Sequence, residues 1–301
     1  MERERWRNWR GIWGVVKSLF WLVVALLIVY QVWAPYRLSG ARSELLDRFQ
    51  QERKSRVIAM IHREETVSLF GVPVSSYIDI EDSEAVLRAI RLTADDQPID
   101  LILHTPGGLV LAAEQIAHAL VEHKGKVTVF IPHYAMSGGS LIALTADQIV
   151  MDPNAVLGQV DPQIGDTPAA SIVKLLDAKQ PSQIGDDMLI LIDIAAKARL
   201  QVATFMVEVL SKHMPKEKAQ TLAVALSEGR FTHDFPITVE DARQLGFNIS
   251  TDMPRTIYDL MDLYPQSGEG RPSVFYVPFR PAAARRDDAG ASAPPTSGDK
   301  K

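Results

Sequence analysis

Residues 127–145 read VTVFIPHYAMSGGSLIALT, which is two apolar runs joined by a turn of small residues. The first run, 127–131, is typical of a buried strand, and the second, 141–144, is typical of a helix. Ser137 lies between them, where a hydroxyl can sit at a helix N-terminus and free backbone N–H groups can stabilise a developing negative charge. The stretch therefore predicts acyl chemistry with Ser137 as the nucleophile. A serine that only caps the helix is the plain alternative.

A second glycine turn precedes this one by about thirty residues. It reads His104-Thr105-Pro106-Gly107-Gly108 and follows the apolar run 99–103. In a parallel α/β sheet, functional sites gather at the carboxyl ends of the strands. We therefore expect the two turns to frame one site.

The rest of the chain supports such a sheet. Predicted strands alternate with predicted helices, which indicates an α/β fold with a mostly parallel sheet and flanking helices. The strands are expected at 56–62, 99–103, 127–131 and 148–151, and the helices between them at 82–92, 109–122 and 137–145. Asp82 is expected to begin the first of these helices. Later helices are expected at 186–212, 216–226 and 239–245, the first with an apolar face that includes Ile192 and Leu200.

The N-terminal region predicts a membrane anchor. Residues 18–36 contain no charged residue and are long enough to span a bilayer. A buried core helix and a cleaved signal peptide are the alternatives. The predicted organisation is a basic segment at 1–17, a transmembrane signal anchor at 18–36, a charged stalk at 37–56, a catalytic domain at 57–265, and a C-terminal extension with a disordered tail at 266–301. By a narrow margin, the flanking charges favour a cytoplasmic N-terminus and an extracytoplasmic catalytic domain.

Composition excludes several classes of protein. Cysteine is absent, which excludes disulfides, cysteine nucleophiles and cysteine metal sites. A net charge of −5 argues against a nucleic-acid partner. His118 and His123 do not have the spacing of a zinc helix, and no HExxH occurs. We expect neither a metal nor a cofactor.

Four motifs together resemble those of the Clp protease/crotonase superfamily. They are His104–Gly108, Ala135–Gly139, Ala146–Met151 and Asn154–Gly158. Within that superfamily the chain resembles the signal-peptide-peptidase-A-like proteases, and above all the serine dehydrogenase proteinase family. No GxGxxG supports dehydrogenase chemistry. The resemblance implies that Ser137 is the nucleophile and that the N–H groups of Gly138 and of Gly107 or Gly108 form an oxyanion hole.

The resemblance leaves the general base open. Gln159 stands where Clp-type proteases place a histidine, and glutamine cannot act as a base. Signal-peptide-peptidase-like relatives use a lysine instead, which requires burial to lower its pKa. Lys179, 42 positions after Ser137, is the favoured candidate, with Lys174 and then Lys197 as alternatives.

Histidines beside the turns are the fallback. His104 and His133 lie near the strand ends, and structural roles are favoured for both. His133 would serve as the base if no lysine reaches Ser137.

The expected protein is a membrane-anchored serine peptidase with a Ser-Lys mechanism, in a bacterial inner membrane. Its substrates would be peptides or membrane-associated polypeptides, and the resemblance implies a homo-oligomer. Two alternatives come from other classes of protein. One is an inactive scaffold that binds polypeptides, and the other is a crotonase-like enzyme acting on an acyl thioester.

Overall fold

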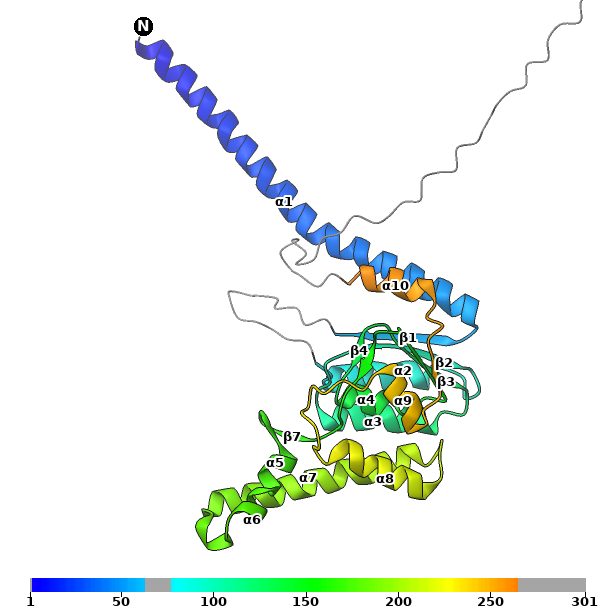
Figure 1. The fold of residues 1–301 in the computed structure, drawn as a ribbon. Helices are drawn as coiled ribbons and strands as arrows, with labels where there is room; N and C mark the ends of the chain where they lie inside the picture. Colours follow the sequence, from blue (N-terminus) through cyan, green and yellow to red (C-terminus); the bar gives the residue numbers. More distant parts are fainter. Residues whose placement is uncertain (1, 63–76, 265–301) are drawn as a thin grey trace, which may run out of the picture. The chain divides into compact units, whose positions relative to one another are not determined.

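A five-stranded parallel sheet forms the centre of the fold (Figure 1). The computed structural model describes residues 2–62 and 77–264; within the first helix it describes the side chains of residues 17–25 and 37–53 only. The strands, in spatial order, are β1 (Arg56–Ile61), β2 (Ile99–His104), β3 (Val127–Ile131), β5 (Gln148–Met151) and β9 (Ile249–Ser250). The predicted α/β class with a parallel sheet is confirmed.

The register aligns the carboxyl ends of the central strands. Ile61 pairs with His104 across β1 and β2, and Ile131 pairs with Met151 across β3 and β5. Beyond β2, Thr105 continues with a parallel bridge to Ala135. Both glycine turns therefore leave the sheet at the same edge.

Helices cover one face of the sheet and form the larger core. Alternate residues of the central strands, such as Leu101 and Val129, are fully buried against them. The helices on this side are α2 (Ile80–Arg91), α3 (Val110–Glu122), α4 (Gly138–Ala143), α7 (Asp186–Leu210), α8 (Lys216–Ser227) and α9 (Val239–Leu245). Helix α3 illustrates why these helices pack against the sheet. Its buried residues recur every three to four positions, which gives it one apolar face.

The two ends of the described chain cover the other face. Helix α1 (Glu2–Arg53) and helix α10 (Arg255–Asp262) lie side by side there (Figure 1). Phe49 and Ile257 pack with Ile102 and Phe130 in a second core. The predicted stalk at 37–56 is thus helical as far as Arg53, and its last turns belong to the packed domain.

The predicted membrane span lies only partly within the described side chains. Of residues 18–36, those at 26–36 lie outside them, and Leu19, Phe20 and Trp21 are about 60% exposed. No helix in the described part of the chain is long and apolar enough to cross a membrane. The predicted basic segment at 1–17 lies almost entirely outside the described side chains, and the predicted extension at 266–301 lies wholly outside the described residues.

Short elements link the sheet to an arm. Strands β4 (Tyr134–Ala135) and β6 (Val156–Leu157) pair beside the Ser137 turn, and β7 (Gln163–Ile164) pairs with β8 (Thr167–Pro168). The arm consists of α5 (Ala169–Val173), α6 (Leu175–Ala178), the 3₁₀ helix η1 (Pro181–Gln183) and the first half of α7. It has a small core of its own, in which Ile172 and Ile192 are buried.

Two local predictions were wrong. Helix α2 begins at Ile80 rather than at Asp82, because Asp79 caps it and exchanges hydrogen bonds with Asp82 in a capping box. On α7, Leu200 is 69% exposed, and Val202 and Met206 are buried instead. The helix changes neighbours from the arm to the main core, so no single stripe is buried along its length.

Candidate active site

Ser137 adopts a backbone conformation that ordinary residues avoid. Its φ is 51° and its ψ is −120°, and Lys54 is the other described non-glycine residue with positive φ. Such a conformation costs about 1–3 kcal/mol and is characteristic of functional turns. Ser137 occupies the N-cap position of α4, yet its side chain makes no capping hydrogen bond. The plain alternative of a capping serine is therefore not what the structure shows.

The neighbouring serine has a structural role. Ser140 is buried, its hydroxyl donates to the Ala135 carbonyl at 2.7 Å, and it accepts the Gly158 N–H at 2.8 Å. A hydroxyl used in two buried hydrogen bonds is not free to react. Ser137, half-buried and without a recorded partner among the described residues, is the serine that can.

The Gly107-Gly108 turn lies against Ser137. A Cβ on Gly107 would lie 2.7 Å from the Ser137 Cβ and 3.2 Å from its Oγ. A Cβ on Gly108 would lie 2.2 Å from the Ile78 carbonyl oxygen. Both glycines have positive φ, 108° and 157°, so only glycine fits these positions without strain.

Beside Ser137, two backbone N–H groups make no hydrogen bond within the described residues, those of Gly108 and Gly138. The Gly107 N–H donates to Thr105 Oγ1 at 3.2 Å. The N–H groups of Gly108 and Gly138 have no acceptor within the described residues. The two glycines are close, since a Cβ on Gly138 would lie 3.8 Å from the Gly108 nitrogen. Of the predicted donors, Gly108 and Gly138 are thus the pair available to an oxyanion.

A small cavity opens beside Ser137. Its volume is about 70 Å³, enough for a few water molecules or a small side chain. Apolar side chains dominate its lining: Val110, Ala113, Leu141, Val160, Pro162 and Val202. Asp161 and Gln163 add polar groups to the wall.

Asp161 belongs to a partly buried polar cluster that the sequence did not reveal. Its side chain is 1% exposed and accepts hydrogen bonds from His233 Nδ1 at 2.7 Å and from Gln163 Nε2 at 2.8 Å. Because an ionised carboxylate only accepts, His233 carries its proton on Nδ1 in this pair. Asp161 and His233 are 72 positions apart in the chain, and no motif joins them.

The candidate bases do not lie beside Ser137. Lys174 and Lys179 follow α5 and α6 and are exposed, and Lys197 on α7 is exposed and paired with Asp193. None of the three lines the cavity. The structure therefore brings together Ser137 and the glycines, and leaves the lysines on the arm.

Gln159, His104 and His133 do not line the cavity at Ser137. Gln159 is buried and lines a different cavity, between α8 and α9. The His104 ring is fully buried and lies 5.7 Å from the His133 ring and 4.3 Å from the Tyr134 ring. Among the described side chains, no three histidine or acidic residues are grouped as a metal would require.

Comparisons with known proteins give the same family as the motifs. The model of a family described as ClpP-like SDH-type serine proteinase matches residues 11–292. The chain is 52% identical over 260 residues to the uncharacterized protein MJ1495 of Methanocaldococcus jannaschii, covering 86% of this chain and 88% of that protein. It is 51% identical over 270 residues to MJ0137 of the same organism, covering 88% and 93%.

Two solved structures resemble part of the chain. The chain resembles ClpP1 from Listeria monocytogenes with a TM-score of 0.43 and 16% identity, covering 68% of this chain and 96% of that one. It also resembles a variant of the 1510-N membrane-bound stomatin-specific protease in complex with a substrate peptide, with a TM-score of 0.39 and 20% identity, covering 59% and 72%.

Proposed function

Because this chain belongs to the family of ClpP-like SDH-type serine proteinases, we propose that it is a membrane-anchored serine peptidase that acts through an acyl-enzyme on Ser137. The family resemblance expected from the motifs is confirmed by the match over residues 11–292. One observation supports the activity most strongly. Ser137 holds a strained backbone conformation with an unbonded hydroxyl, next to two unused N–H groups.

The chemistry follows from these groups. Ser137 Oγ attacks the carbonyl carbon of a peptide bond as its proton passes to a base. The N–H groups of Gly108 and Gly138 donate to the oxygen that becomes negative, which is worth about 10²–10³-fold in rate for each donor. The base returns the proton to the leaving amine, and water then hydrolyses the ester on Ser137. Apart from the peptide itself, the reaction consumes only water.

The base in this proposal is a lysine, and Lys179 is the first candidate. Its support is its position 42 residues after Ser137 and the Ser-Lys chemistry that the resemblance implies. A neutral amine is required, and burial next to the site would favour one. Because Lys179 is exposed on the arm, the arm must bring it to Ser137 when substrate binds or when copies assemble.

Assembly is part of the proposal. The arm exposes several large apolar side chains, and contiguous exposed apolar surface is typical of protein interfaces. They include Leu176 at 44%, Ile190 at 59% and Ile194 at 46%. A homo-oligomer would bury them.

Anchoring rests on the N-terminal helix. Leu19 to Leu22 are more than half exposed on α1, and the uncharged run of the sequence continues to residue 36. A helix that presents such side chains would hold the catalytic domain close to a bilayer, and its substrates would be peptides or membrane-associated polypeptides. Extraction of the full chain from membranes with carbonate tests this, since an anchored protein stays in the pellet.

Active-site labelling tests the central claim. A fluorophosphonate should label the full-length protein, and Ser137→Ala should abolish labelling. Ser211→Ala is the matched control, because Ser211 is an exposed serine at the end of α7. Labelling that persists in Ser137→Ala rules out Ser137 as the nucleophile.

Peptide hydrolysis by the lysine variants tests the base. Lys179→Ala should lower turnover by about 10²–10⁴-fold, the usual contribution of a general base. Lys174→Ala and Lys197→Ala should retain it. If Lys179→Ala keeps full activity, the assignment of this lysine is wrong.

A polypeptide-binding protein without hydrolytic activity is the second candidate function. It is favoured by the finding that no candidate lysine lines the cavity at Ser137. Peptide binding by an assembled wild-type protein that resists fluorophosphonate would support it. Turnover of an acyl thioester without serine labelling would instead support crotonase-like chemistry.

A further inference from the structure

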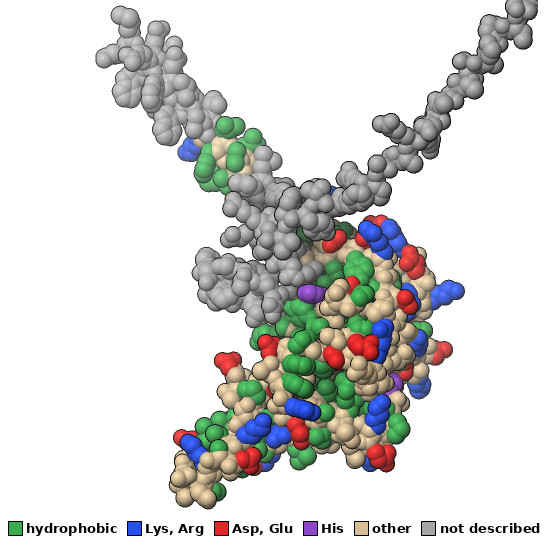
Figure 2. Space-filling model, in the orientation of Figure 1, with side chains coloured by type: hydrophobic (Ala, Val, Ile, Leu, Met, Phe, Trp, Pro, Cys, Tyr) green, Lys and Arg blue, Asp and Glu red, His purple; other side chains and the backbone are tan. Residues whose placement is uncertain are grey.

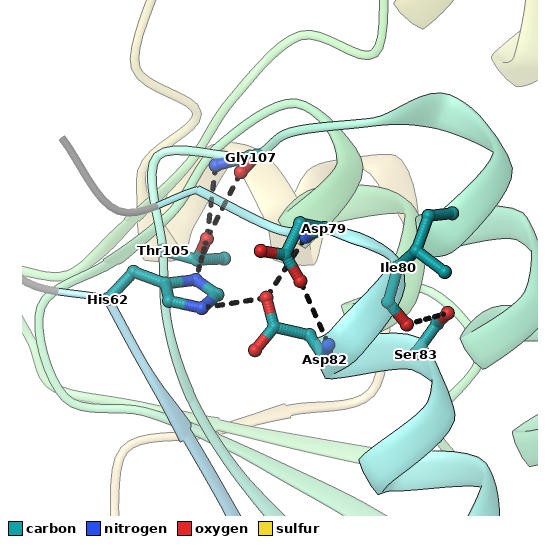
Figure 3. A network of polar contacts seen from close by, with 7 residues as sticks. All are labelled: His62, Asp79, Ile80, Asp82, Ser83, Thr105 and Gly107. Atoms are coloured by element: carbon teal, nitrogen blue, oxygen red, sulfur yellow. Dashed lines mark hydrogen bonds and ion pairs between the residues drawn. The ribbon is translucent and has the colours of Figure 1, made fainter. Parts of the chain in front are cut away.

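A network of polar contacts lies beside Gly107 (Figure 3). Thr105 Oγ1 accepts the Gly107 N–H at 3.2 Å and lies 2.9 Å from His62 Nδ1. His62 Nε2 lies 3.1 Å from Asp82 Oδ2. The network therefore joins the end of β1, the turn after β2 and the first turn of α2.

Proton positions follow from the chemistry of the four groups. Since the Asp82 carboxylate only accepts, the proton of a neutral His62 sits on Nε2, and its Nδ1 accepts the Thr105 hydroxyl proton. If His62 is protonated, Nδ1–H donates to the Thr105 oxygen instead. In both states the Thr105 oxygen keeps a lone pair for the Gly107 N–H.

The same carboxylate oxygen is also linked, through Asp79 and Ile78, to the carbonyl of Gly107. Asp82 Oδ2 accepts the Asp79 N–H at 3.0 Å, which fixes the N-cap of α2, Asp79, directly after Ile78. The Ile78 N–H donates to the Gly107 carbonyl at 2.7 Å, and the Leu109 N–H donates to the Ile78 carbonyl at 2.8 Å. One route thus leads from Asp82 to Thr105, whose hydroxyl accepts the Gly107 N–H and also lies 3.4 Å from the Gly107 carbonyl. The other leads through Ile78 to that carbonyl.

Because the peptide unit is planar, holding the Gly107 carbonyl also fixes the direction of the Gly108 N–H. The Gly107 carbonyl and the Gly108 N–H belong to one planar trans peptide unit, so they point in opposite directions. With the carbonyl held by Ile78, the Gly108 N–H points away from Ile78. Glycines turn freely, so without such restraints this peptide unit would have other orientations available.

We propose that Asp82, through His62 and Thr105 on one side and Ile78 on the other, positions the Gly108 N–H as an oxyanion donor. Asp82, His62 and Thr105 are then positioning residues, which do not touch the substrate. The proposal rests on the peptidase function proposed above. Misplacing a donor lowers the rate of the chemical step, with binding of the reagent little changed.

The Thr105 pair tests the first route. Thr105→Val keeps the shape but loses the oxygen, and Thr105→Ser keeps the oxygen. With a fluorophosphonate probe, Thr105→Val should lower the maximal labelling rate by about 10–100-fold while the half-saturating concentration stays unchanged. Thr105→Ser should restore the rate to within a few-fold of wild type. Equal rates for the two variants would overturn the proposal.

Two substitutions of Asp82, which is more exposed than Thr105, test the role of its carboxylate oxygen. Asp82→Asn keeps an oxygen that can accept the Asp79 N–H and face His62 Nε2, and Asp82→Ala removes it. The Ala variant should show the larger loss of labelling rate. Asp79→Ala is the matched control, because it removes the reciprocal bond to the Asp82 N–H but leaves Oδ2 untouched. If Asp79→Ala slows labelling as much as Asp82→Ala does, the effect is only that of a weakened helix start.

Amide hydrogen exchange separates this proposal from the peptidase function. The Gly107 amide should exchange faster in Thr105→Val than in wild type and Thr105→Ser. An unlabelled wild type would sink the peptidase function, and the exchange result would still decide whether Thr105 holds the turn. Unchanged exchange in Thr105→Val would sink the positioning role even in an active enzyme.

Discussion

The Ser137 turn and the lysine-bearing arm differ in how firmly the fold holds them. All six residues of α4 are buried, whereas α6, between Lys174 and Lys179, has no buried residue. Charged side chains of both signs lie among apolar ones along the arm (Figure 2). The comparison teaches that one copy of the chain holds Ser137 and the neighbouring glycine N–H groups at the carboxyl ends of the sheet strands, while the candidate lysines belong to a segment with a separate, small core.

Core truncation should give the largest difference between the two regions. Ile142→Ala in α4 removes a fully buried side chain and should cost about 2–5 kcal/mol in the free energy of unfolding. Ile190→Ala on α7 changes a side chain that is 59% exposed and should cost less than about 0.5 kcal/mol. Denaturant unfolding measures both. Equal costs would mean that Ile190 is packed as firmly as Ile142.

A pair of glycine substitutions tests the same difference at the level of rate. Gly108→Ala places a Cβ within 2.4 Å of Ile78 backbone atoms, which should displace the N–H donor and slow fluorophosphonate labelling by about 10²–10³-fold. Gly185→Ala at the start of α7 meets nothing within 4 Å and should label at the wild-type rate. Normal labelling of Gly108→Ala would show that the turn tolerates change.

A comparison of ion pairs should give the smallest effect. Arg53 Nε donates to Asp100 Oδ2 at 2.8 Å, and Asp100 is 1% exposed. Arg53→Met should cost about 2 kcal/mol, less than for a fully buried pair because Arg53 is 39% exposed. Lys197→Met on the arm removes an exposed pair and should cost under about 0.5 kcal/mol.

The direction in which the pKa of Arg53 shifts determines how the stability contributed by the Arg53–Asp100 pair depends on pH. The hydrogen bond from Arg53 to Asp100 raises the pKa of the arginine. A base with a raised pKa in the folded state keeps its full contribution below its unfolded-state value and loses it only as the pH rises through the folded-state value. The cost of Arg53→Met should therefore be constant between about pH 6 and pH 9. A cost that changes across this range would contradict the assignment.

Local sequence patterns predicted the sheet well and the packing around it less well. The strand at 127–131 and the helix at 239–245 are where periodicity and capping residues placed them. The start of α2 was missed because Asp79 and Asp82 are both good capping residues; Asp79 is the N-cap, and Asp82 supplies the reciprocal bond of the capping box. The exposed Leu200 was assigned to the core because α7 changes neighbours along its length.

The candidate site was predictable only in part. Ser137 and the glycines stand out because small residues are needed wherever backbones approach closely. The positive φ of Ser137 depends on the packing of two turns, so the sequence does not reveal it. The pairing of Asp161 with His233 and the Asp82 network join segments that are far apart in the chain. Such contacts appear only once the fold is known.

The second face of the sheet has a consequence for synthesis. Phe49 and Ile257 close over Ile102 and Phe130 from opposite ends of the domain, 208 positions apart. At ribosomal speed, roughly 10–40 s separate the appearance of the two residues. Throughout that interval the face of the sheet that α1 covers still lacks α10. A chaperone that binds apolar strands would therefore find its target on the α10 side, and stalling the ribosome before residue 255 would prolong that contact.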